Sequence, residues 1–217
     1  SKVTTMKSMF NRASVFNKDI GGWNTAAVTE MENMFYDATA FDKNSNTNEV
    51  TPGGGGSVYT AWNTSNVIKM NSMFSSSSSH TFNQDLSGWN TAAVTEMSYM
   101  FLRCHLFNGD ISGWDVSNVT TMFSLFRSAS VFNQDIGGWD VSNVTNMNQM
   151  FQFAYKFNQD IGNWNVYNTT DMGYMFQNAT DFNQEIRGWD VSNVAVFTNM
   201  FKTATAFKSN YGVDDTP

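Results

Sequence analysis

Two rows of oxygen-bearing side chains recur at fixed distances from the tryptophans, and they are the residues best suited to chemistry. The first row lies four residues before the tryptophans and comprises Asp19, Asp85, Asp110, Asp135, Asp160 and Glu185. Carboxylate oxygens from neighbouring repeats are ligands that Ca²⁺ accepts. The candidate calcium ligands in this acidic row are Asp110, Asp135, Asp160 and Glu185.

Backbone capping is the favoured role for the acidic row. Its spacing matches no EF-hand or other calcium signature, and Val58 interrupts it. The carboxylates follow Phe-Asn-Gln or a variant of it, where a tight turn leaves N–H groups in need of an acceptor. We therefore expect these side chains to cap turns, with weak calcium binding as the alternative and no other cofactor.

The second row directly follows the tryptophans and is the expected binding face. Its members are Asn24, Asn63, Asn90, Asp115, Asp140, Asn165 and Asp190. We expect each to lie on the outer face of a short strand, beside Gly, Ser or Ala, so that the face is flat and polar. The residues expected to contact a ligand are Asn90, Asp115, Asp140, Asn165 and Asp190.

Two further rows carry amides and hydroxyls. The amide row, Asn66, Asn118, Asn143, Asn168 and Asn193, predicts a buried ladder that bonds the backbone of the next turn. Three of these residues also match the N-glycosylation pattern, which the repeat generates automatically. The hydroxyl row is Thr29, Thr95, Thr120, Thr145 and Thr170. A regular threonine array is compatible with ice binding, a minor alternative because Ile68 and Ala195 interrupt it.

The single cysteine excludes an internal disulfide and offers no catalytic pair. Cys104 aligns with alanines of the other repeats, so it is expected to fill a small core position. His105 follows it, but no further Cys or His aligns with it to complete a zinc site or a nucleophile–base pair. The sequence therefore predicts that the protein is not an enzyme.

These rows exist because the sequence repeats. Trp occurs at positions 23, 62, 89, 114, 139, 164 and 189, and the last four intervals are each 25 residues. Met-Phe pairs recur with the same period. A constant period of this length is typical of a solenoid, in which each unit buries its apolar face against its neighbours. We expect one domain over 1–217 with about eight repeats, the first and last incomplete, and because residue 1 falls in the middle of a repeat we expect the chain to be part of a longer protein.

Each repeat predicts two short elements. Ile111, Trp114 and Val116 have the L-x-x-L-x-L spacing of a leucine-rich-repeat strand, which puts the Trp ring in the core. The residues Met122, Leu125, Phe126 and Ala129 follow at i, i+3, i+4 and i+7. That spacing predicts about two turns of helix or 3₁₀ helix.

The unit F-N-Q-D-I-x-x-W-D-V-S-N-V-T-x-M-x-x-M-F-x-x-A resembles the BspA-like leucine-rich repeats, in the subgroup known as the mycoplasma-lipoprotein-like 25-residue repeat. The resemblance covers nearly the whole chain. It implies an α/β repeat fold, a right-handed solenoid with one short parallel strand and one short helix or 3₁₀ segment per unit. It also implies a secreted or surface-attached protein that binds or adheres.

Composition limits the partners. The net charge is −7 and no basic run is present, which argues against nucleic acid. No apolar run is long enough to cross a membrane, so this segment is not expected to insert into one. A Gly-rich insertion at 42–56 breaks one repeat and predicts a surface loop.

The sequence thus favours a non-enzymatic binding or adhesion module, extracellular or on the cell surface, with a protein or glycan partner. The alternative is a structural segment of a long fibre, stalk or coat that contacts neighbouring copies of itself. Ice-binding or calcium-binding solenoids are minor alternatives.

Overall fold

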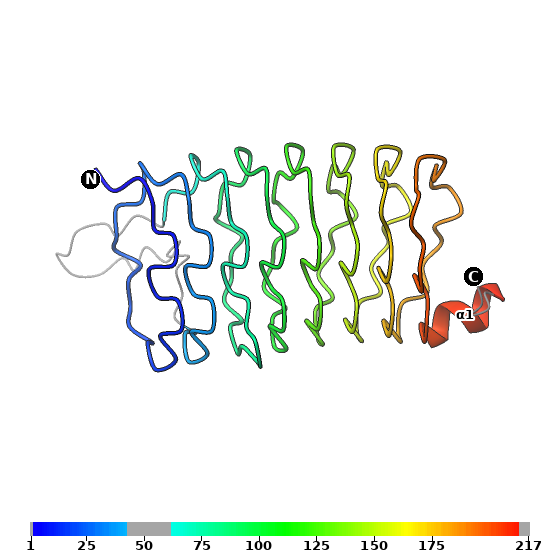
Figure 1. Cartoon of the computed structure of the whole chain (residues 1–217), viewed down its shortest axis with the longest axis horizontal. Helices are drawn as coiled ribbons and strands as arrows, with labels where there is room; N and C mark the ends of the chain where they lie inside the picture. The colour runs from blue at the N-terminus through cyan, green and yellow to red at the C-terminus, as the bar shows by residue number, and fades with distance from the viewer. Residues whose placement is uncertain (1, 43–61, 213–217) are drawn as a thin grey trace, which may run out of the picture.

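The chain winds as a row of similar turns stacked along one axis (Figure 1). This computed structural model describes residues 2–42 and 62–212. One α-helix, α1 (Thr205–Tyr211), follows the last turn. Its Phe207 ring stacks on Phe201 at 4.3 Å and on Phe182 at 5.7 Å, so α1 covers part of that end of the stack. Among the described helices, none has the length and apolarity to cross a membrane.

Isolated parallel β-bridges join each turn to the next. One row of them runs through the residue before the first apolar residue of each Met-Phe segment, which is Met in every turn except the last, where it is Phe197. The bridged residues, in order, are Thr5, Glu30, Lys69, Glu96, Thr121, Asn146, Asp171 and Val196. Bridges of single residues replace the expected strand at Ile111–Val116, whose placement was wrong. There the N–H of Trp114 donates to Ile111 and the N–H of Val119 to Val116, so the backbone forms tight turns instead of a ladder.

The expected helix at Met122–Ala129 is also absent from the described repeats. Ser124 and Ser128 have φ values of 55° and 60°, which an α-helix does not allow. The N–H groups of Ser124 and Phe126 donate to the following turn, at 2.9 Å each, in place of the residue four back. Two consecutive tight turns place the residues at i, i+3, i+4 and i+7 on the same inner side as a helix would. All four of these apolar side chains are therefore fully buried, as the spacing predicted.

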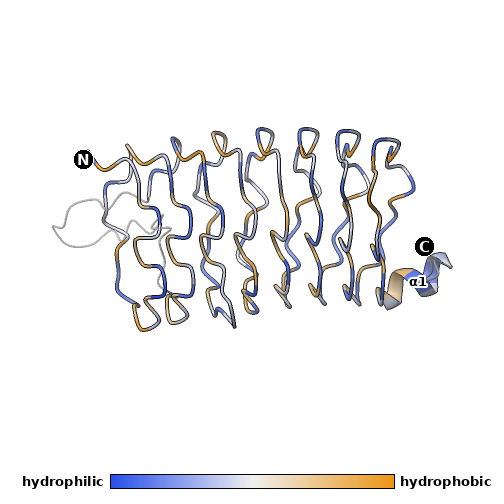
Figure 2. Cartoon of the chain, viewed as in Figure 1, coloured by the Kyte–Doolittle hydropathy of each residue, from blue (hydrophilic) through white to orange (hydrophobic). Residues whose placement is uncertain are grey.

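Aromatic rings form continuous columns inside the stack. Phe126 packs at 3.9 Å on Phe132 within its turn and at 5.8 Å on Phe151 of the next turn. Trp114 and Trp139 stack at 6.5 Å with an angle of 1° between the rings. Figure 2 shows apolar and polar stretches alternating around each turn, as a core enclosed by every turn requires. The prediction that the Trp rings lie in the core is confirmed for Trp62 to Trp189, whereas Trp23 in the first turns is only half-buried.

Most of the predicted loop insertion at 42–56 lies outside the described residues. The turns on either side of it remain neighbours in the stack. Glu30 and Lys69 form a parallel bridge, and the Trp62 indole N–H donates to the Ile20 carbonyl at 3.0 Å. The repeat pattern therefore continues across the insertion.

The aromatic column predicts a large effect of a single truncation. Phe151 is fully buried between rings at 3.9 Å, 5.6 Å and 5.8 Å. Phe151→Ala should lower the free energy of unfolding by about 3–5 kcal/mol in a urea melt. Half-exposed Phe153 is the matched control, and Phe153→Ala should change that free energy by about 1 kcal/mol or less. Equal effects of the two variants would contradict the assignment of the core.

Candidate functional site

The carboxylates of the acidic row accept backbone N–H groups two residues further on. Asp135 accepts from Gly137 at 3.0 Å, Asp160 from Gly162 at 2.9 Å, and the rest of the row follows the same pattern. Turn capping, the favoured prediction, is confirmed. The N–H and hydroxyl of Ser112 hold the pKa of Asp110 below its usual value. The side chain of Arg187 lowers the pKa of Glu185 to about 2.

Across residues 2–42 and 62–212, no three His, Cys, Asp or Glu side chains gather closely enough to hold a metal ion. The calcium candidates Asp110, Asp135, Asp160 and Glu185 are exposed, and each carries out its turn bond within its own repeat. Each carboxylate belongs to a separate turn. This arrangement serves backbone capping, and calcium binding remains a prediction to be tested.

Calcium should leave the stability of the protein unchanged. We expect the same melting temperature with a chelator and with about 5 mM Ca²⁺, a concentration above the weak extracellular affinity range. The measurement is a thermal melt followed by circular dichroism. A rise of many degrees with calcium, abolished in the variant with Asp135→Asn and Asp160→Asn, would instead make these carboxylates ligands.

The expected binding-face residues form a second row of turns and do not lie on the bridge ladder. Each side-chain oxygen accepts the N–H two residues later; the members are Asn90, Asp115, Asp140, Asn165 and Asp190. All five are exposed. Hydrogen bonds from the following Ser residues hold the pKa values of Asp115, Asp140 and Asp190 below their usual value. Placing this row on a strand was wrong, because its backbone N–H groups close turns.

The amide row joins neighbouring turns but is not buried. The Asn143 side-chain N–H donates to the Ser117 carbonyl of the preceding turn at 2.7 Å, and the other members make the same bond. The predicted bond to a neighbouring backbone is therefore confirmed, while its burial and its direction toward the next turn were wrong. One backbone acceptor satisfies each amide at the edge of the stack. A glycan attached to this nitrogen at Asn118, Asn143 or Asn168 would disrupt the bond.

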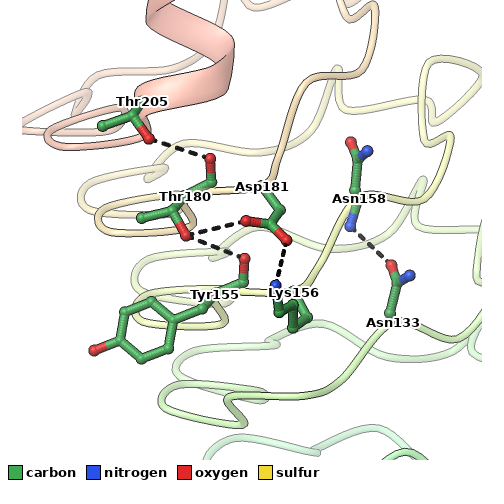
Figure 3. Close-up of polar contacts among 7 residues, drawn as sticks. All are labelled: Asn133, Tyr155, Lys156, Asn158, Thr180, Asp181 and Thr205. Atoms are coloured by element: carbon green, nitrogen blue, oxygen red, sulfur yellow. Dashed lines mark hydrogen bonds and ion pairs between the residues drawn. The ribbon is translucent and has the colours of Figure 1, made fainter.

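Hydroxyl groups act in the same way on two other edges. In the threonine row, Thr145 donates from both its N–H and its hydroxyl to the Thr120 carbonyl, at 2.9 Å and 3.1 Å. Figure 3 shows another edge, where the Thr205 hydroxyl donates to the Thr180 carbonyl and the Thr180 hydroxyl to the Tyr155 carbonyl, at 3.4 Å each. These side chains stabilise the stack from its surface. Their hydroxyl hydrogens are used in bonds to the preceding turn.

One face is free of this uniformity. We define the ladder face as the side chains that change from turn to turn, and not the repeated Met, Leu and Phe residues of the core, in eight segments. These segments are 5–12, 30–37, 69–76, 96–103, 121–128, 146–153, 171–178 and 196–203. The position after the first Met, for instance, holds in successive turns Lys7, Glu32, Asn71, Ser98, Phe123, Asn148, Gly173 and Thr198. The turn rows hold the same few residue types throughout, whereas this face changes from turn to turn.

Contacts across the ladder face are mostly complementary. Lys7 and Glu32 form an ion pair at 3.2 Å, the Asn71 amide donates to Glu96 at 2.8 Å, and the Asn148 amide donates to Asp171 at 2.9 Å. In the bridged row, Lys69 lies between Glu30 and Glu96. In these contacts neighbouring turns match their charges, as opposed strand residues generally do.

A family model described as Mycoplasma protein of unknown function, DUF285, matches residues 1–52, 57–130 and 107–214. The chain belongs to this family. Three matches along one chain agree with a repeated unit. No curated protein matches the chain. The DUF285 description gives no activity, so the function has to be argued from the faces described above.

Within this DUF285 chain, His80 and Cys104 are neighbours on adjacent turns, which the comparison of repeats in the sequence did not predict. A parallel bridge joins them, although no Cys or His was expected to align with Cys104. The fully buried His80 accepts the Phe82 N–H at Nδ1, at 3.1 Å, so Nε2 carries the proton of the neutral ring. The Cys104 thiol donates to the Phe74 carbonyl at 3.0 Å. The signal in the sequence is the Ser75–His80 segment, which is two residues longer than its equivalents in the other repeats.

Burial keeps both groups uncharged. It lowers the pKa of His80 to about 4, against the opposing effect of the Asp42 charge, the Phe35 carbonyl and the Asp37 charge. It raises the pKa of the Cys104 thiol well above its usual value. A protonated thiol is a poor nucleophile and a poor metal ligand. The pair therefore belongs to the core, as predicted for Cys104.

The free energy of unfolding should decrease as the pH is lowered, because His80 is buried in its neutral form. The unfolded chain takes up a proton near pH 6.5, but the folded protein does so only near pH 4. Stability is therefore complete above pH 6.5 and should decrease by about 3 kcal/mol as the pH falls to about 4. Urea melts across this range should show the decrease in the wild type and in His105→Gln, but not in His80→Gln. The same slope in all three proteins would refute the assignment.

Proposed function

We propose that this DUF285 chain is a non-enzymatic binding module that engages a protein or glycan partner through the ladder face, outside the cell or on its surface. Its architecture is proposed to be a right-handed solenoid like that of the BspA-like leucine-rich repeats. The stacked turns and the 25-residue period support this architecture. The resemblance in the repeat motif supports the location.

The variation of the ladder face carries the proposal. Many side chains elsewhere on each turn bond the neighbouring turns or cap their own turn, and at these positions the same few types recur, chiefly Asp, Asn, Thr and Trp. The ladder-face side chains are bonded less uniformly, and they include Tyr99, Phe123, Arg127, Gln149 and Tyr174. Aromatic and Arg side chains dominate the energy of protein interfaces. A scaffold that repeats everywhere except on one face is suited to recognition there.

The groups that could perform chemistry support a non-enzymatic role. The turn carboxylates, such as Asp135 and Asp160, are exposed and accept hydrogen bonds from the backbone of their own turn. Within the described residues, these two carboxylates have no hydrogen bond to a side chain that could act as a base. His80 and Cys104 are sealed in the core. Catalysis needs a nucleophile or base that a substrate can reach.

A structural role in a fibre, stalk or coat is the second candidate. In turn after turn, the Met-Phe segments donate N–H bonds toward the following turn; for example, Gln149 donates to Gly173 and Phe151 to Met175. Any turn can therefore follow any other, as an array of unlimited length requires. Ice binding by the threonine row is a minor proposal, because its hydroxyls already donate to carbonyls.

Tyr174 and Tyr167 provide a matched test of the proposed face. Both lie in one repeat. Tyr174 is on the ladder face, whereas Tyr167, which is 49% exposed, lies in the turn capped by Asn165. The biotinylated chain would be applied to an array of glycans and extracellular-matrix proteins. Tyr174→Ala should weaken binding at least about tenfold, the loss of one interface contact of about 1.4 kcal/mol, while Tyr167→Ala should not.

Circular dichroism melts of both variants serve as the folding control. Binding that depends on Tyr167 and not on Tyr174 would place the face on the turn rows. A chain that binds nothing on the array and forms filaments at high concentration would favour the fibre.

A further inference from the structure

Two hydrogen-bonded rungs on the ladder face bring two aromatic and two cationic residues together. The Tyr99 N–H donates to the Phe123 carbonyl at 2.9 Å, and the Arg103 N–H donates to the Arg127 carbonyl at 2.8 Å. The Tyr99 and Phe123 rings meet edge to face, with centroids 4.9 Å apart. All four side chains are half-buried. The aromatic rung and the arginine rung are four residues apart on the same two turns, so they form one continuous patch.

The arginine rung breaks the charge matching seen elsewhere on this face. Like charges on directly adjacent strands destabilise the pairing. The cations Lys7, Lys156 and Arg187 each have a carboxylate within ion-pair distance. In the described part of the chain no carboxylate lies that close to Arg103 or Arg127. Glu96, which shares a turn with Arg103, instead accepts from the Asn71 amide at 2.8 Å.

The next turn holds Arg127 in place. Gln149 Oε1 accepts from an Arg127 guanidinium N–H at 3.1 Å and from the Ser124 hydroxyl at 3.0 Å. Burial, together with the nearby charge of Arg103, holds the pKa of Arg127 below its usual value. A neutral amide fixes the guanidinium without neutralising it, so the positive charge of the rung is left for an external anion.

We propose that this patch of Tyr99, Arg103, Phe123 and Arg127 binds an acidic peptide segment of a protein partner. This rests on the proposed function, and it specifies the partner that the ladder face takes. A Glu or Asp carboxylate accepts paired N–H bonds from the guanidinium groups, whose planar fork matches a carboxylate. An apolar side chain next to that carboxylate packs against the rings of Tyr99 and Phe123.

The charge of the whole chain favours a short acidic segment over a polyanion. With a net charge of −7, the protein repels a heavily sulfated glycan, and a single arginine pair offers little compensation. One or two carboxylates beside an apolar side chain match the two rungs in both number and kind. Clustered arginines recognise acidic motifs in the same way in other peptide-binding modules.

The test uses a short fluorescein-labelled peptide with a single Glu-Glu-Leu segment, and the same peptide with Gln-Gln-Leu as the neutral control. Fluorescence anisotropy should show saturable binding of the acidic peptide that weakens as salt is raised. The variant with Arg103→Gln and Arg127→Gln should bind it about tenfold or more weakly. Arg187→Gln should stay within about twofold of the wild type, because that exposed arginine lies outside the ladder face and already pairs with Glu185.

Thermal melts separate binding from folding. Removing two like charges should leave the melting temperature of the double Arg variant unchanged or raise it, so weaker binding reports on the patch itself. Equal affinity of wild type and double variant, no binding of the acidic peptide, or binding of a heparin oligosaccharide in its place would each overturn the inference. Array binding that needs Tyr174 but neither arginine would overturn it while leaving the proposed function intact.

Discussion

Each turn of this protein depends on its two neighbours for both its hydrogen bonds and its core. The N–H groups of Met147, Gln149, Phe151 and Phe153 all donate to the following turn. Trp139 and Thr145 donate in the opposite direction, to carbonyls of the preceding turn. Aromatic columns run through the same interfaces at ring spacings of 5.6–5.8 Å for the central Phe column. A single turn has neither a complete set of backbone partners nor a core, so only the stack is stable.

This dependence divides the surface into two kinds of position. Where a side chain bonds a neighbouring turn, any replacement must preserve that bond in a fixed geometry, so Asn143 and its equivalents recur almost unchanged. On the ladder face the bridges and the backbone N–H bonds recur in turn after turn, whereas the side-chain bonds between turns differ from one pair of turns to the next. No single side-chain type is therefore required there for stacking. The face that can vary is therefore determined by which atoms hold the turns together.

The same distinction explains what could be predicted from the sequence. Residue spacing correctly predicted the buried positions of Trp139, Phe151 and Cys104 and the turn-capping role of Asp135, because burial and capping depend on residue type and period. The backbone path could not be predicted. Positive φ values at Gln149 and Phe153 turn a helical spacing into consecutive tight turns, and neither residue type signals that conformation. The strand was misplaced for the same reason, so the residues expected on its outer face lie in turns instead.

Stacked turns also explain how the chain can contain a local conflict such as the arginine rung. In a compact globular core, two opposed like charges would disturb many contacts at once. Here Arg103 and Arg127 lie on adjacent turns, and each turn contacts only the turns next to it. The repulsion is confined to one interface, while Phe101 and Phe126 stack beneath it at 5.6 Å with rings inclined by 2°. The fold therefore tolerates a pair of like charges on this face, and under the proposed function a ligand carboxylate would relieve the conflict instead of competing with an internal ion pair.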